Sequence, residues 1–372
     1  MINFGLLHLF ESAEGKTEHE FIQDNLAMAR CADEAGLDSI WMAEHHFTDY
    51  GVMPSIQVMS AYLAAHTRRL RLGAGVVVLP FHNPIRVAEE MALIDQLSEG
   101  RVDFGVGRGY QPVEFEAYGI PFGESRERFD ECLQVIQQSW TQEEVNFEGK
   151  HYQYKGIRPR PRPFQQPHPP IFGASFNPAT IKFQAMKRLN LLFPFLMTKP
   201  DKIAEYRQTL RDGGENPDDY RIGGLTFTYL DEDYERALAD FEEPCMWYFR
   251  NLVQLIPKEA SGDEDGYYRN LGQILRTTLK SYEGGEMSFR WMVEQSPFSQ
   301  AFLVGDAAHV RPKLARLMRD YEGLTDILCW TRLGGLDHNM VMRSMSLFVD
   351  QVIKPLRAGE PLVVSEQVVQ AG

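Results

Sequence analysis

Short runs of apolar residues alternate along the chain with longer stretches in which apolar positions recur at helical spacing. A short apolar run between turn residues is typical of a buried strand, and a 3.6-residue period is typical of an amphipathic helix. The runs predict strands at 2–9, 39–42, 70–79, 102–106, 171–173, 191–195, 222–230 and 325–330. The periodic stretches predict helices at 20–36, 56–63, 83–99, 125–140, 181–188, 200–213, 306–322 and 339–356.

Strand followed by helix, repeated eight times, predicts an α/β protein. A doubly wound sheet and a closed barrel are the two α/β solutions. The repeats are spread evenly over the 372 residues, and no Gly/Ser linker or interior charge run divides them. We therefore expect a single TIM (β/α)8 barrel domain over residues 1–372, in which the carboxyl end of every strand points to one rim.

The regular spacing breaks between residues 242 and 298, before the last strand. This stretch mixes aromatic side chains with the polar run 261–265 and with Gly284-Gly285. It predicts a helix, a mobile loop and a second helix, which together form an insertion or lid large enough to cover a pocket and exclude water. The same aromatic side chains are equally consistent with core packing.

Composition narrows the classes of partner. The chain is 44% hydrophobic, so it can bury a large core, and 52 acidic against 38 basic residues give a net charge of -14. We expect no nucleic acid and no membrane as partners, since no basic block offsets this charge and no run of about 18 apolar residues occurs. Four widely spaced cysteines and no apolar signal core before the first strand predict reduced thiols and a cytoplasmic location.

Three polar residues, Glu44, His45 and His46, follow the strand at 39–42. In parallel α/β proteins the chemistry is placed at such strand ends. A shared metal ion is disfavoured, because adjacent strand residues point to opposite faces and no HxH or HExxH spacing occurs. A nucleophilic hydrolase is also disfavoured, because the chain has no Gly-x-Ser-x-Gly elbow. We expect one histidine to face the pocket and the other to be buried against Glu44 or a neighbouring helix.

Other strand ends bring further polar or flexible residues to the same rim. They are His8, Gly75, Arg108, Tyr110, Ser175, Thr180, Trp330 and Arg332. Arg126, in the first turn of a helix, suits a nearby anion, because a cation is unfavourable at that position. Arg108, Arg126, Ser175 and Thr180 together suit one phosphate group. Several of these residues also have a purely structural interpretation when each is considered alone. Gly75 could mark a β-bulge, Ser175 or Thr180 could cap a helix, and Arg126 could pair with Glu124 or Glu127 at the surface.

Several motifs resemble those of the bacterial luciferase-like, flavin-dependent monooxygenase family, in the family's order and over nearly the whole chain. They are Ala-Gly-Leu-Asp-Ser-Ile-Trp-Met-Ala-Glu-His-His-Phe at 35–47, Val-Val-Leu-Pro at 77–80, Arg-Val-Asp-Phe-Gly-Val-Gly-Arg-Gly-Tyr at 101–110 and Pro-His-Pro-Pro at 167–170. The resemblance implies a TIM barrel and a flavoprotein monooxygenase. It also implies reduced FMN as a co-substrate, supplied by a separate NAD(P)H:flavin reductase, with O2 oxidising a small organic substrate through a flavin C4a-peroxide.

The resemblance also implies roles for individual residues. His45 matches the histidine beside the flavin, with Glu44 and His46 as its neighbours. Gly75 and Val76 match a pair joined by a non-proline cis peptide under the flavin ring. The phosphate-binding set matches Arg108, Arg126, Ser175 and, with a one-residue shift, Thr180; Tyr110 closes the third motif beside the cofactor. Gly107 stands where luciferase has a reactive cysteine, which counts against light emission and a long-lived peroxyflavin.

Two other functions fit the same resemblance. Deazaflavin-dependent relatives share the barrel and transfer a hydride without oxygen, and some luciferase-like subunits bind flavin or a partner subunit without catalysis. A homodimer through the helices near 55–67 and 83–98 is also implied. The aromatic insertion and the 15 methionines suggest a small apolar substrate such as an aldehyde, ketone or terpene.

Overall fold

The computed structural model describes residues 2–12, 15–256 and 266–362. Eight strands form the central sheet: β1 (Asn3–His8), β2 (Ser39–Met42), β3 (Arg71–Ala74), β5 (Val102–Gly107), β8 (Ile171–Ala174), β9 (Asn190–Pro194), β10 (Ile222–Leu230) and β12 (Asp326–Trp330). All neighbouring pairs are parallel, and the pairing of β9 with β10 closes the circle. The fold is the predicted TIM barrel.

Helices connect the strands and surround them. The helices that follow barrel strands are α1 (Glu18–Ala35), α2 (Ile56–His66), α3 (Pro84–Leu97), α5 (Ser125–Thr141), α6 (Ile181–Met186), α7 (Pro200–Asp212), α8 (Tyr234–Leu255) and α12 (His338–Phe348). The remaining α-helices are α4 (Pro112–Ala117), α9 (Tyr267–Glu283), α10 (Phe289–Glu294), α11 (Ala307–Asp320) and α13 (Lys354–Arg357). Short 3-10 turns are η1 (Leu79–Phe81), η2 (Phe122–Glu124), η3 (Pro178–Thr180), η4 (Pro217–Asp219) and η5 (Ser299–Ala301), and η6 (Val349–Ile353) is a π-helix.

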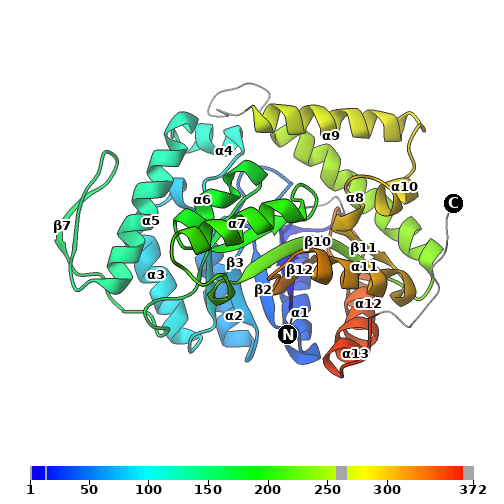
Figure 1. Cartoon of the computed structure of the whole chain (residues 1–372), viewed down its shortest axis with the longest axis horizontal. Helices are drawn as coiled ribbons and strands as arrows, with labels where there is room; N and C mark the ends of the chain where they lie inside the picture. The colour runs from blue at the N-terminus through cyan, green and yellow to red at the C-terminus, as the bar shows by residue number, and fades with distance from the viewer. Residues whose placement is uncertain (1, 13–14, 257–265, 363–372) are drawn as a thin grey trace.

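Local sequence signals set several helix ends where the pattern predicts them. Thr17 and Glu20 form a capping box at the start of α1, and Gly36 ends that helix in the left-handed region with φ 90°. Asn83 caps α3, whose first residue is Pro84. A hairpin of β6 (Val145–Glu148) and β7 (Gln153–Ile157) projects from the body of the molecule (Figure 1).

The predicted strand at 70–79 is wrong as one continuous element. It divides into β3 and the two-residue β4 (Val77–Val78), and both pair with β5. Gly73 pairs with Asp103, and Val77 pairs with Val106. Between these two pairs the chain advances four residues from β3 to β4 but only three along β5. This extra residue is a β-bulge, and it falls at the Gly75–Val76 peptide, which is cis.

The sequence-based prediction lacks α10, the third helix of the insertion, and two elements near the mouth of the barrel. The four-residue strand β11 (Phe302–Gly305) pairs with the last part of β10. Phe227 of β10 pairs with both β11 and β12, so β11 continues the side of β10 that β9 occupies lower in the barrel. The other missed element is α4, directly after β5. Both are too short to show a clear period in the sequence.

The rim at the carboxyl ends of the strands, called the mouth below, is covered by α4, α8 and α9 (Figure 1). The amino ends of the strands form the opposite end, called the base. The predicted insertion at 242–298 contains most of α8 together with α9 and α10, while its polar run at 261–265 lies outside the described residues. Its function as a lid stays a prediction.

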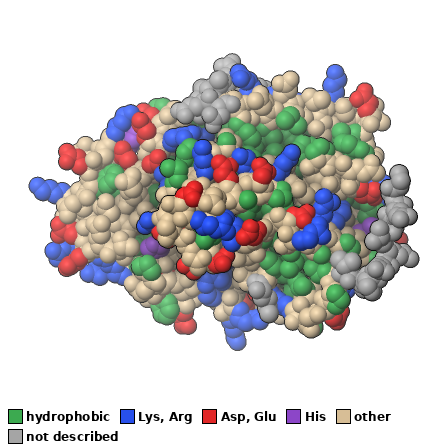
Figure 2. Space-filling model, in the orientation of Figure 1, with side chains coloured by type: hydrophobic (Ala, Val, Ile, Leu, Met, Phe, Trp, Pro, Cys, Tyr) green, Lys and Arg blue, Asp and Glu red, His purple; other side chains and the backbone are tan. Residues whose placement is uncertain are grey.

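The charged and apolar side chains of the outer surface are relevant to the predictions about a membrane, nucleic acid and a second subunit. Figure 2 shows positive and negative side chains interspersed over the face formed by α6 and α7. Helices α2 and α3 expose the apolar side chains Val58, Tyr62, Leu93 and Leu97, and a dimer through these helices stays a prediction. None of the helices in the described part of the chain combines the length and apolar character needed to cross a bilayer.

Candidate active site

A cavity of about 470 Å³ opens at the mouth of the barrel. Its walls come from the ends of the barrel strands and from helices that cover the mouth. Every predicted site residue except His46 lines it, namely Glu44, His45, Gly75, Val76, Arg108, Tyr110, Arg126, Ser175 and Thr180. Segments that are up to 136 residues apart in sequence, from Glu44 to Thr180, therefore meet around one space.

Of the other residues predicted for the rim, Trp330 lines the cavity and His8 and Arg332 do not. Leu7 and Leu9 face the cavity, so the alternation of β1 turns His8 to the other side of the strand. Burial, together with Arg332, lowers the pKa of His8 to about 3. Arg332 itself pairs with Asp24 at 3.0 Å. These two residues belong to the packing behind the barrel wall.

Glu44 anchors the wall of the cavity. Its Oε1 accepts hydrogen bonds from Nε2 of His46 at 3.0 Å and of His82 at 2.7 Å, and its Oε2 accepts from the backbone N–H of Val78 at 2.9 Å. Burial raises the pKa of Glu44, but these donors outweigh it and hold the pKa below its ordinary value. The carboxylate thus fixes both His46 and the segment that follows the Gly75–Val76 bulge.

The two adjacent histidines have different surroundings, as the alternation along a strand predicts. His46 is enclosed, since its Nε2 pairs with Glu44 and its Nδ1 lies 3.0 Å from the hydroxyl of Tyr118. His45 lines the cavity and contacts protein through Nδ1, which lies 3.2 Å from Oε1 of Glu114 and 3.0 Å from Nε2 of Gln111. No described residue forms a hydrogen bond with Nε2 of His45, so this nitrogen is the one available to a ligand.

Glu114 and Gln111 place opposite demands on Nδ1 of His45. A carboxylate oxygen favours a proton on that nitrogen, whereas an amide N–H favours a lone pair there. Pairing with Glu114 therefore leaves a lone pair on Nε2, and pairing with Gln111 leaves a proton on Nε2. A neutral imidazole held in this way can accept or donate a proton on its cavity side.

Sequence reasoning missed both Glu114 and Gln111 because it did not predict α4. The available signal was Pro112, which suits the first position of a helix, directly after the strand end that carries Arg108. Glu114 is almost fully buried, and its Oε1 also accepts from the backbone N–H of His46 at 3.0 Å. It therefore ties α4 to the histidine pair.

One end of the cavity is rich in groups that bind anions. Arg108 and Arg126 line it together with the hydroxyls of Ser175 and Thr180, which are hydrogen-bonded to each other. Among the described residues, no carboxylate forms an ion pair with Arg108. Lys187 also lines this end, but it is paired with Asp130 at 2.6 Å. The hydroxyls of Ser175 and Thr180 also donate to the backbone carbonyl of Asn177, at 3.1 and 2.7 Å. A phosphate group placed here would meet guanidinium donors, and a hydroxyl could donate to it only by turning away from this carbonyl.

Gly75, Val76 and Gly107 form a closely packed part of the cavity wall. The predicted cis peptide joins Gly75 and Val76. A Cβ added at Gly107 would lie 2.4 Å from Cγ2 of Val76, so any side chain at position 107 would have to displace this wall. Within the described residues, no group of three His, Cys, Asp or Glu side chains could hold a metal ion.

Comparison with known proteins agrees with this geometry. A family model described as luciferase-like monooxygenase matches residues 2–322. The alpha chain of an alkanal monooxygenase from Photorhabdus luminescens is 25% identical over 89% of this chain and 90% of its own length. The oxygenase component of a flavin-dependent trigonelline monooxygenase from Acinetobacter baylyi is 30% identical over 65% of this chain and 68% of its own.

Two solved structures share the fold. The oxygenating constituent of 3,6-diketocamphane monooxygenase from Pseudomonas putida, in complex with FMN, has a TM-score of 0.77 and 18% identity, covering 94% of this chain and 97% of that chain. A coenzyme F420-dependent tetrahydromethanopterin reductase from Methanopyrus kandleri has a TM-score of 0.68 and 18% identity, covering 95% of this chain and 99% of that one.

Proposed function

The chain belongs to the luciferase-like monooxygenase family, a family of flavin-dependent monooxygenases, and we propose that it is the oxygenase component of a two-component system. In this proposal it takes reduced FMN from a separate NAD(P)H:flavin reductase and uses O2 to transfer one oxygen atom to a small apolar organic substrate. The observation that carries the proposal is the cavity itself, because its lining combines anion-binding side chains, apolar and aromatic side chains and His45.

The residues of the cavity fit FMN. Arg108, Arg126, Ser175 and Thr180 would hold the phosphate, and the wall of Gly75 and Val76 would support the ring system. The arginines supply charge and donors to a dianionic group, and the wall offers apolar contact to a planar one. Tyr110, which also lines the cavity, would lie beside the cofactor.

Bound reduced FMN would supply the electrons with which O2 is activated for oxygen transfer. The protein's own residues would handle the proton. In the state paired with Gln111, His45 presents an Nε2–H that can donate to a developing anion beside the ring. In the state paired with Glu114, its Nε2 can take a proton back. Glu44 and His46 act as positioning residues that hold the strand end on which His45 lies.

Isotope labelling tests this function directly. The full chain would be mixed with FMN, NADH, a flavin reductase and 18O2, with decanal, 2-decanone and 1-tetralone as probe substrates. We expect one 18O atom in the oxidised product of at least one probe. We also expect His45→Ala to bind reduced FMN as tightly as the wild type but to lose roughly 100-fold in product while it still consumes oxygen, because a general acid contributes about 10²–10⁴-fold.

His66→Ala is the matched control, because His66 lies on the exposed end of α2 and should leave product and oxygen uptake unchanged. Equal coupling of oxygen uptake to product in His45→Ala and wild type would contradict the role of His45. Tighter binding of reduced F420 than of reduced FMN would instead assign the deazaflavin reaction. Absence of both oxygen uptake and cofactor binding would identify a non-catalytic subunit.

A further inference from the structure

Part of the cavity wall consists of aromatic rings that come from distant segments of the chain. This aromatic half consists of Tyr50, Tyr110, Phe176, Tyr248, Tyr268 and Trp330. Tyr248 lies on α8 and Tyr268 on α9, so the covering helices complete the wall. Helix α9 is tied down by the hydroxyl of the neighbouring Tyr267, which donates to the backbone carbonyl of Phe176 at 3.0 Å.

Three of these rings lie in nearly the same orientation. The plane of Tyr110 makes angles of 3° with Phe176 and 10° with Tyr268, and Phe176 and Tyr268 differ by 9°. Each ring centroid lies 5.7–6.4 Å from the other two. The three pairs are stacked with an offset, so the rings form one group of common orientation in the cavity wall. A ring face that this group presents to the cavity favours a ligand that is itself flat, because a flat ligand can continue the stack.

The hydroxyls of this half form a hydrogen-bonded chain that begins at His45. Nε2 of Gln111 contacts both Nδ1 of His45, at 3.0 Å, and the hydroxyl oxygen of Tyr110, at 3.5 Å. The Tyr110 hydroxyl donates to Tyr50 at 3.2 Å, and the Tyr50 hydroxyl donates to Tyr248 at 3.2 Å. The amide N–H of Gln111 donates to Tyr110 at the start of these bonds, which leaves the Tyr110 proton for the bond to Tyr50.

One O–H group of the three hydrogen-bonded tyrosines has no acceptor. Burial raises the pKa of Tyr50, Tyr110 and Tyr248, so all three hydroxyls keep their protons at neutral pH. Three O–H protons share two O···O contacts, and among the described residues no acceptor takes the proton of Tyr248. Because Tyr248 lines the cavity, its O–H is available to an oxygen that a ligand brings.

We propose that the aromatic half binds a flat, aromatic substrate whose carbonyl or hydroxyl oxygen accepts a hydrogen bond from Tyr248. This inference rests on the proposed function, in which the anion-binding end holds the cofactor and leaves the aromatic half for the substrate. An oxygen-free hydrocarbon would leave the Tyr248 hydroxyl buried without an acceptor. A flexible aliphatic chain would lose rotational freedom on binding and could not stack on the parallel rings.

Binding to the flavin-free full chain tests the proposal without any dependence on turnover. Isothermal calorimetry would compare four ten-carbon probes: 1-tetralone, its saturated counterpart 1-decalone, oxygen-free naphthalene and the aliphatic decanal. We expect 1-tetralone to bind at least fivefold more tightly than 1-decalone and decanal. We expect Tyr268→Leu to weaken 1-tetralone and naphthalene by the same factor, since it removes stacking from both.

The tyrosine hydroxyl gives the sharper test. Tyr248→Phe should weaken 1-tetralone roughly three- to tenfold, the range expected for one hydrogen bond, and leave naphthalene within twofold. Tyr321→Phe is the matched control, since it removes a buried hydroxyl that donates to the carbonyl of Thr198 outside the cavity, and should change neither affinity. Its thermal midpoint also shows how much loss of a buried hydroxyl costs the fold.

Two outcomes would overturn the inference: decanal or 1-decalone binding as tightly as 1-tetralone, or Tyr248→Phe weakening naphthalene as much as 1-tetralone. These outcomes are separable from a failure of the proposed function. A chain that binds 1-tetralone as expected but does not bind reduced FMN would retain the aromatic site and lose the monooxygenase assignment. The converse result would keep the enzyme and reject this substrate class.

Discussion

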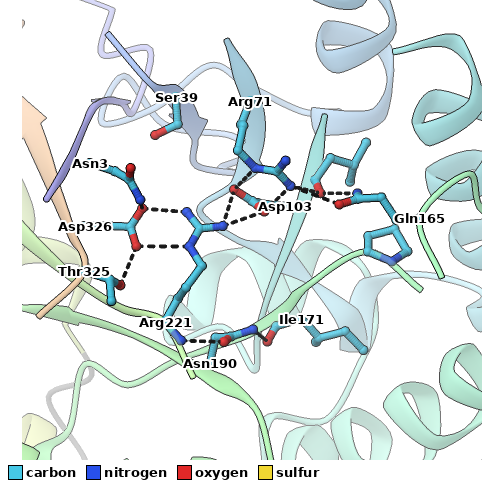
Figure 3. A network of polar contacts seen from close by, with 12 residues as sticks. Asn3, Ser39, Arg71, Asp103, Gln165, Ile171, Asn190, Arg221, Thr325 and Asp326 are labelled. Atoms are coloured by element: carbon cyan, nitrogen blue, oxygen red, sulfur yellow. Dashed lines mark hydrogen bonds and ion pairs between the residues drawn. The ribbon is translucent and has the colours of Figure 1, made fainter. Parts of the chain in front are cut away.

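The two ends of the barrel use charged side chains in opposite ways. At the base, Arg71 and Arg221 share Asp103, and Arg221 reaches on to Asp326, so that every charge has a partner (Figure 3). At the mouth, Arg108 lines the cavity, and no carboxylate of the described residues pairs with it. The same residue type thus closes one end of the barrel and leaves the other end open to a ligand.

The difference follows from the cost of burying charge. Asp103 and Asp326 are fully buried, and a buried carboxylate is tolerated only when it is paired and hydrogen-bonded. Asn3 and Thr325 supply the remaining bonds to Asp326. At the mouth, Arg108 contacts the ring of Phe122, 5.9 Å from its guanidinium carbon, and no carboxylate of the described residues neutralises it. It therefore keeps its attraction for an anionic ligand, so that binding energy is held for the ligand and is not spent on the fold.

The largest effect that this comparison predicts is on stability at the base. Arg221→Met would leave Asp326 without its cation and deprive Asp103 of one of two. Removing one partner from a buried charge network costs about 3–5 kcal/mol, so we expect a loss of that size in the free energy of unfolding, measured by urea denaturation. Arg316→Met, which removes an exposed pair with Asp320, should change it by less than about 1 kcal/mol.

A loss below about 1 kcal/mol for Arg221→Met would show that water or neighbouring groups compensate the two aspartates. The contrast between base and mouth would then have no energetic basis.

A smaller effect, on binding and not on stability, is expected at the mouth. Arg108→Met should weaken reduced FMN by roughly 30-fold, about 2 kcal/mol for a charge-assisted contact to phosphate. Riboflavin, which lacks the phosphate, is the matched ligand and should bind within twofold of wild type. The urea midpoint should stay unchanged. Anaerobic fluorescence titration measures both affinities, and an equal loss for riboflavin would place Arg108 elsewhere than at the phosphate.

The barrel could be predicted from sequence because each strand–helix repeat is a continuous segment with its own hydrophobic pattern, and the repeats follow one another along the chain. Each barrel strand is an apolar run, and caps such as Asn83 mark where helices begin. The bulge at Gly75 could be predicted only in part. A glycine indicates an irregular strand, but it does not determine how that strand pairs with β5. The strand β11 was missed because four apolar residues carry no period.

Most of the site could be predicted from residues at strand ends, and Arg126 from its place in the first turn of a helix. Glu44, His45 and Arg108 follow directly from the rule that parallel strands present their carboxyl ends at one rim. His8 and Arg332 show the limit of that rule, because alternation along a strand decides which side a residue faces. Glu114 and the tyrosine chain could not be found in this way, since their role depends on contacts between elements that are distant in sequence.

Substitution of Glu114 is expected to have the smallest effect and gives the most specific test of the difference between base and mouth. Glu114 is a buried carboxylate of the mouth, and its partner is a histidine and not an arginine. Glu114→Gln replaces the acceptor at Nδ1 of His45 with an amide that can donate to that nitrogen. The proton of His45 would then be held on Nε2, and the ring would lose the state that accepts a proton. We expect the rate of product formation to fall about tenfold, less than the roughly 10²–10⁴-fold that loss of the acid–base group itself would cost, because the imidazole stays in place.

The readout must separate proton handling from structure. In Glu114→Gln, the affinity for reduced FMN should stay within twofold and the pH dependence of the rate should change shape, whereas Glu114→Asp, which keeps the carboxylate, should recover part of the rate. Glu11→Gln is the matched control: Glu11 is also buried and accepts from the backbone N–H of Gly334, but it lies outside the cavity lining. If Glu114→Gln kept the wild-type pH profile, Glu114 would be a structural tie between α4 and the histidine pair, and the proton on His45 would be set by Gln111 alone.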